Sequence, residues 1–219
     1  MKLIIFLLVI SIFAVTIIPN ALALREDTQD TWHTWEIEKE QSLQISLTDN
    51  KYATPQRIAL INEVVMSDET LEIDDNLMHK GPKGNVSTYY LGWHGALNSI
   101  TDTKLPVPKN LKFDLTDKAT GNIVITLYNY KHPDGYSGFT SIYGDTMIIS
   151  IYDVERQSTS QLQTITRHEL GHAFGLEHAT APEDLMAQNI TTWYPYISPC
   201  NVMALDALYN GQSTITCEE

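Results

Sequence analysis

The chain has 219 residues and a formal net charge of −13 at pH 7, with 14 Lys and Arg against 27 Asp and Glu. Nucleic-acid binding needs basic side chains that neutralise phosphates, so we expect no nucleic-acid partner. The acidic surface favours solubility and says nothing about the fold. This length is enough for one domain with a real hydrophobic core and a small N-terminal extension.

The first residues have the pattern of an export signal. Lys2 precedes an apolar run over residues 3–18, and Ala21-Leu22-Ala23 has the small-x-small form of a cleavage site. We expect residues 1–23 to be a cleaved signal peptide. The alternative is that residues 3–18 are retained and tether the protein to the outer face of a membrane. In both cases the rest of the chain is expected to be secreted or extracellular.

The next part of the chain carries weak patterns. Residues 24–84 are predicted to be an N-terminal extension or pro-segment of uncertain structure, with a hairpin within Ile58–Ile73. The domain that carries the chemistry is then expected over residues 85–219. It begins with a predicted helix over Ser87–Ile100, where aromatic and aliphatic residues recur at three- and four-residue spacing.

Strands and then helices follow. Apolar runs predict strands over 111–115, 122–130 and 146–152. A helix is predicted from the N-cap candidates at 158–160 to about Phe174, and a last helix from Ser198-Pro199 to Asn210-Gly211. Because the strands come first and the helices close the chain, the order indicates an α+β domain.

The two cysteines, Cys200 and Cys217, lie close together near the C-terminus. In an exported protein a disulfide between them is the natural expectation. A loop of this length would be stabilised by roughly 3 kcal/mol on the chain-entropy estimate. Two free thiols or an intermolecular bridge are the alternatives.

The chemistry lies in one short segment. His168 and His172 are four residues apart on the predicted helix, so both rings leave the same face and suit a tetrahedral Zn²⁺. Gly175 can end the helix with a positive φ and return the chain, so that His178 supplies a third ligand. Glu169, beside the first ligand, is then placed to act as general base and later as general acid on water activated by the metal.

The segment from His168 to His178 resembles the long zinc signature H-E-x-x-H-x-x-G-x-x-H of the metzincin metallopeptidases. Met186 follows at the distance of the family's Met-turn, and this offset is most similar to the matrixin branch. Matrixins usually have Ser after the third histidine, where this chain has Ala179. The resemblance implies a zincin-like α+β fold: a twisted mixed β-sheet with an active-site helix, a second packing helix and a C-terminal helix.

The resemblance also implies a single catalytic zinc ion and a substrate that pairs with an edge strand. The best candidate strand lies between Gly138 and Gly144, and a plain surface loop is the alternative. Its residues are Phe139, Thr140, Ser141, Ile142 and Tyr143. Structural calcium has weak candidates in three loop carboxylates, for which solvated side chains are the alternative: Asp134, Asp145 and Asp153.

These observations favour a secreted, zinc-dependent metalloendopeptidase that hydrolyses peptide bonds in peptide or protein substrates. His168, His172 and His178 would bind zinc, Glu169 would transfer protons, and Met186 would be structural. The alternative is a catalytically inactive extracellular module that holds zinc and binds a partner. The intact Glu169 argues against this alternative, because a structural zinc site does not need that carboxylate.

Overall fold

The structure is a computed structural model that describes residues 27–38, 40–78, 83–118, 120–190 and 195–217. Residues 1–23, which the sequence predicts to be a signal peptide or an anchor, lie outside the described residues. Within the described ranges, no helix is both long and apolar enough to cross a membrane.

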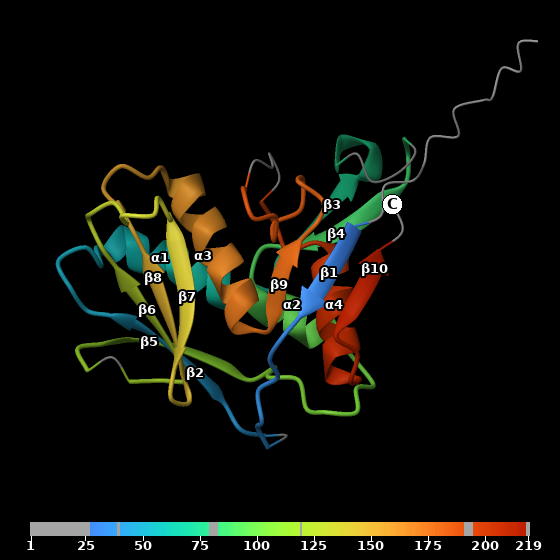
Figure 1. Cartoon of the computed structure of the whole chain (residues 1–219), viewed down its shortest axis with the longest axis horizontal. Coiled ribbons are helices and arrows are strands. Elements are labelled where there is room, and N and C mark those ends of the chain that lie inside the picture. The colour runs from blue at the N-terminus through green and yellow to red at the C-terminus, as the bar shows by residue number, and fades with distance from the viewer. Residues whose placement is uncertain (1–26, 39, 79–82, 119, 191–194, 218–219) are drawn as a thin grey trace, which may run out of the picture.

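A five-stranded mixed sheet lies on one side of the molecule (Figure 1). Its order is β5-β2-β6-β8-β7, in which the first four strands are parallel and β7 runs antiparallel at the edge. The bounds are β2 (Leu43–Thr48), β5 (Leu111–Thr116), β6 (Ile123–Leu127), β7 (Gly138–Tyr143) and β8 (Thr146–Ile151). β6 is a nearly continuous apolar run, whereas β2 alternates apolar and polar residues and β8 alternates buried and half-buried positions.

Two helices pack together beside this sheet. These are α1 (Pro55–Met66) and α3 (Thr159–Ala173), and α3 also packs against β7 and β8. The start of α3 is fixed by a capping box, in which Ser158 Oγ accepts from the backbone N–H of Gln161 and the Gln161 side chain accepts from the backbone of Ser158. Since the cap sets where the helix begins, it also sets which residues of α3 face the sheet.

The second half of the molecule lies on the other side of α3 (Figure 1). A three-stranded sheet has the order β10-β1-β9, formed by β1 (Asp27–Thr31), β9 (Leu176–Ala179) and β10 (Thr214–Cys217). Beside it lie α4 (Pro199–Tyr209), α2 (Trp93–Ser99), the hairpin of β3 (Thr70–Asp74) and β4 (Val86–Tyr90), and the 3₁₀ turn η1 (Asp75–Met78). The first strand of the described chain therefore pairs with its last strand.

The α+β fold and the mixed sheet are confirmed, as are the strands near 111–115, 122–130 and 146–152 and the helices that begin after Ser158 and Ser198. The hairpin predicted within Ile58–Ile73 is wrong. Pro55 at the first helical turn, with Thr54 as N-cap, begins α1, and Ile61, Val64 and Val65 form its buried face. The helix predicted over Ser87–Ile100 is correct only in its second half. Residues 86–90 form β4, and the helix α2 covers 93–99.

Residues on both sides of position 85 contribute strands to the same two sheets. β2 lies between β5 and β6, and β1 lies between β9 and β10. Leu43, Ile45 and Leu47 of β2 are fully buried in the same core as the strands that follow. Residues upstream of 85 therefore supply inner strands to both sheets.

Candidate metal centre

Helix α3 presents three of the predicted site residues, His168, Glu169 and His172. The rings of His168 and His172 leave the same face, with their centroids 4.6 Å apart. His178 comes from β9, and its ring centroid lies 5.5 Å from that of His168 and 4.8 Å from that of His172. One nitrogen from each of the three rings lies within 4.8 Å of the others, so the set could hold a metal ion.

The hydrogen bonds of the two helical histidines fix their tautomers. His168 Nδ1–H donates to the carbonyl of Leu185 (2.8 Å), and His172 Nδ1–H donates to the carbonyl of Leu176 (2.7 Å). The two Nε2 atoms, 3.1 Å apart, therefore both carry lone pairs and have no hydrogen to share. Two converging lone pairs are stabilised by a cation between them, so this donor set fits zinc.

Burial keeps these rings neutral. Burial, together with the neighbouring histidines, lowers the pKa of His168 to about 4 and the pKa of His172 to about 3. Burial also lowers the pKa of the more exposed His178. Metal ligation requires the neutral imidazole, so the three rings are in the ligating form at neutral pH.

His178 reaches the other two rings because the chain turns at Gly175. This glycine has φ +110°, and a β-carbon on it would overlap the carbonyl oxygen of His33. A positive φ costs a glycine little, whereas a residue with a side chain would be strained. The predicted role of Gly175 in ending the helix matches this geometry.

Glu169 is packed against the edge strand β7. The residue is 5% exposed, and its Oε2 accepts from Thr140 Oγ1 at 2.7 Å. A β-carbon on Gly138 would overlap the Glu169 carboxylate, so the strand approaches closely only because residue 138 is glycine. Burial raises the pKa of Glu169 to about 7, and the hydrogen bond from Thr140 opposes this rise. Such a carboxyl group can both accept and release a proton near neutral pH.

Met186 is fully buried, and its sulfur occupies the space that a β-carbon on Gly171 would need. Met186 therefore packs against α3 at Gly171, between the positions of His168 and His172. The carbonyl before it, that of Leu185, holds His168, and its own carbonyl accepts from the N–H of Ala179. The turn that contains Met186 thus contacts both the helix and the strand that carry the histidines.

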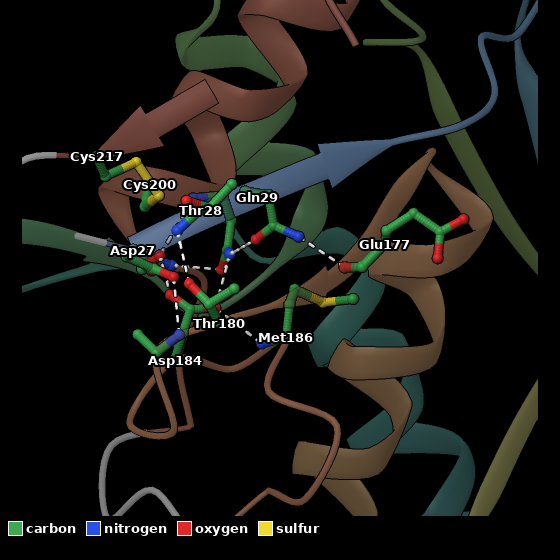
Figure 2. The surroundings of a disulfide bond; sticks show 12 residues. Asp27, Thr28, Gln29, Glu177, Thr180, Asp184, Met186, Cys200 and Cys217 are labelled. Carbon is green, nitrogen blue, oxygen red and sulfur yellow. Dashed lines mark hydrogen bonds between the residues drawn. A yellow bond between two sulfur atoms is a disulfide. The ribbon is translucent and has the colours of Figure 1, made fainter. Parts of the chain in front are cut away.

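A buried polar network connects this turn to β1 (Figure 2). Gln29 is fully buried, and its Nε2 donates to the carbonyl of Glu177, the residue before His178, at 2.6 Å. Its Oε1 accepts from Asn201 Nδ2 (3.1 Å), which also donates to Asp184 Oδ1 (2.8 Å). Asp184 Oδ1 accepts from the N–H of Met186 as well (2.8 Å). The N-terminal strand therefore supports the third histidine and the methionine turn together.

The Cys200–Cys217 disulfide is present and lies beside this network (Figure 2), with its Cα atoms 5.9 Å apart. Cys200 belongs to the first turn of α4 and Cys217 ends β10. Because β10 pairs with β1, and β1 pairs with β9, the bridge joins α4 to the sheet that carries His178.

The predicted substrate strand is a strand at a sheet edge, and the alternative of a plain surface loop is wrong. Residues 139–143 lie in β7, which among the described strands pairs with β8 alone. Three supports of the site were missed by sequence reasoning: Gln29, Asn201 and Asp184. Each is an ordinary polar residue in its local sequence, and only the fold brings the three together, so no local signal would have found them.

A helix with two converging histidines, a glycine turn and a third histidine on the next strand form a candidate metal site of the metallopeptidase type. The sequence model of the matrixin family matches residues 92–209. The chain belongs to the matrixin family. Over 63 residues it is 32% identical to a probable matrix metalloproteinase of Invertebrate iridescent virus 3, a match that covers 29% of this chain and 17% of the viral protein.

Proposed function

We propose that this protein is a zinc-dependent metalloendopeptidase that hydrolyses peptide bonds in peptide or protein substrates. The observation that carries the proposal is the pair of converging Nε2 lone pairs of His168 and His172, 3.1 Å apart, next to the buried carboxyl group of Glu169. His178 completes a three-nitrogen set that would hold zinc and would leave one position of the ion for water. Family membership supports the same conclusion.

When bound, zinc supplies a Lewis acid that polarises the scissile carbonyl and lowers the pKa of water. Glu169 then accepts the proton of the attacking water and passes it to the leaving amine. Its burial suits this role, because a carboxyl group with a pKa near 7 exchanges protons readily at neutral pH. Thr140 holds the carboxylate in place through its hydroxyl group.

We also propose that β7 binds the substrate as an added strand. Thr140 places this strand directly beside Glu169, and its outer edge is unpaired within the described sheet. An exposed edge offers main-chain hydrogen bonds to an extended peptide without selecting its sequence. Proline at Ser141 removes a backbone donor, so we expect a fall in kcat/KM with unchanged zinc content. Unchanged kinetics in this variant and in Ile142→Pro would contradict the placement.

The protein is proposed to act outside the cytoplasm. The disulfide supports this, because such bridges persist in oxidising compartments. The apolar segment over residues 3–18 agrees with export. We further propose that the catalytic unit begins near Asp27 rather than at residue 85, since β1 and β2 are inner strands of the two sheets.

Glu169→Gln tests the proposed chemistry. The amide keeps the size of the side chain but cannot accept the proton, so kcat should fall by roughly 10²–10⁴-fold with little change in KM. Zinc content, measured by mass spectrometry of the metal, should stay at one ion per chain because the three histidines are untouched. A variant that retains full activity would remove Glu169 from the mechanism. A wild-type protein that holds zinc but cleaves no peptide would instead favour the inactive binding module.

A further inference from the structure

A cavity of about 530 Å³ lies apart from the three histidines, between the segment that follows β1 and the turn from β7 to β8. Residues 32–37 and Gln41 form one wall. The other wall is formed by Ile142 and residues 144–147, with Asn122 beside them. A volume of this size is within the range of ordinary ligand sites, which runs from about 300 to 1,000 Å³.

The first wall is attached to the end of the zinc-binding helix. The Trp32 indole N–H donates to the carbonyl of His172 (3.1 Å), and the backbone N–H of Trp32 donates to the carbonyl of Gly175 (2.9 Å). The Trp35 indole N–H donates to the carbonyl of Ala173 (3.0 Å). These bonds attach the wall to the last turn of α3, which carries His172.

The second wall continues the proposed substrate strand. Thr140 of β7 contacts Glu169, and Ile142, two residues further along β7, already lines the cavity. At about 3.4 Å per residue, the distance from Thr140 to Gly144 along the strand is on the order of 14 Å. A peptide paired with β7 at the cut bond would therefore place a side chain three to five residues away at the mouth of the cavity.

The lining has a distinct chemistry. Glu36 and Asp145 provide carboxylates, and none of the described lining residues is lysine or arginine. His33 adds no positive charge at neutral pH, because burial lowers its pKa. Trp32 is 41% exposed and offers an aromatic face, while Ile37, Ile142 and Met147 provide apolar surface. A side chain with a long apolar stem and a cationic head is complementary to this lining. Its stem would pack on the apolar surface, and its head would bind the aromatic face and the carboxylates.

We propose that this cavity is a specificity site for a lysine or arginine side chain of the substrate, three to five residues from the cut bond. The proposal rests on the proposed peptidase function. It adds to that function a preference that the strand β7 alone does not give, because main-chain pairing is indifferent to side-chain charge. Glu36, Asp145 and Trp32 are the residues that determine the preference.

Matched peptide series test the site. In each series one position, from five residues before the cut bond to five after it, carries lysine, its neutral isostere norleucine, or glutamate. We expect lysine to exceed norleucine in kcat/KM by about tenfold at one position in the range three to five residues from the cut, and glutamate to be worst there. Glu36→Gln with Asp145→Asn should bring the lysine-to-norleucine ratio close to one. The single variant Glu36→Gln should lower the ratio, and its control Glu38→Gln, which removes one charge from the same exposed segment but not from the lining, should preserve the ratio.

Binding of the same peptides to Glu169→Gln is measured in parallel by Trp fluorescence, so the charge preference is read even without turnover. Cleavage or binding with equal values for lysine and norleucine at every position would overturn the site and leave the peptidase function standing. A lysine preference that survives the loss of both carboxylates would also overturn it. Absence of cleavage in every series, with lysine still bound selectively, would overturn the peptidase function alone.

Discussion

At the scale of single residues, the environment of Glu169 depends on two neighbours in β7. Thr140 donates a hydrogen bond to the carboxylate, and Gly138 leaves room for it. Because the carboxyl group is buried between α3 and β7, its pKa is raised to about 7. The same strand is proposed to bind the substrate, so the proton-transfer group and the peptide would be positioned by one element.

Gln29 has a comparable role for the third histidine. Gln29→Glu keeps an oxygen that accepts from Asn201. It replaces the amide group that donates to the carbonyl of Glu177 with a carboxylate oxygen, which cannot donate. Two oxygens then face each other next to His178. We expect zinc affinity to fall by about 10- to 100-fold, which is the usual effect of removing a residue that orients a metal ligand. Competition with a chromogenic chelator measures the zinc Kd.

Gln212→Glu is the matched control for this change, because Gln212 is exposed and is not part of the buried network. It should bind zinc as the wild type does. Thermal unfolding of the metal-free proteins checks that Gln29→Glu is folded. A folded Gln29→Glu protein with wild-type zinc affinity would show that β1 does not position His178.

The sequence alone brings the three candidate zinc ligands together because their geometry is local. His168 and His172 share one face through the helical period, and Gly175 and His178 follow within the next six residues. Gln29 and Asn201 lie 172 residues apart in sequence, so their contact depends on the pairing of β1 with β9 and could not be derived from spacing.

At the scale of elements, β1 joins the ends of the described chain to the metal centre. It pairs with β10 on one side and β9 on the other, and the disulfide ties β10 to α4. The buried residues of β1 are polar. Asp27 and Gln29 lie in a buried hydrogen-bond network rather than in an apolar core. A period-two apolar pattern was therefore missing, and the strand was not predicted.

Replacing both Cys200 and Cys217 by serine should destabilise the metal-free protein by about 3 kcal/mol, since the bridge closes a short loop in the unfolded chain. Urea unfolding of the two metal-free proteins measures the difference. We also expect weaker zinc binding, because β10 supports β9 through β1. Equal unfolding midpoints and equal zinc affinity would show that the bridge contributes neither to stability nor to the site.

Helix α1 shows why the early elements were predicted poorly. Ile58, Leu60, Val64 and Val65 are aliphatic or β-branched, which favours a strand in a local view. Thr54 and Pro55 at its start are helix signals, and packing against α3 decides the outcome. Tertiary contacts thus outweighed local propensity at this position.

At the scale of the whole molecule, α3 lies between the five-stranded sheet and the three-stranded sheet (Figure 1). The first sheet supplies Gly138 and Thr140 around Glu169, and the second supplies His178. The centre is therefore complete only when both halves are folded around α3. Since β1 and β2 begin the described chain, removal of residues 27–48 is incompatible with this arrangement.

The central claim is that the three histidines hold a zinc ion on which peptide cleavage depends. The most direct measurement is the rate at which the zinc-loaded protein cleaves a diverse peptide mixture, before chelation, after chelation and after zinc is restored. We predict one zinc per chain, cleavage that stops when the metal is removed, and recovery when one equivalent of zinc is added back. Cleavage that continues unchanged in protein shown to be free of metal, or no cleavage by fully loaded protein, would contradict the account.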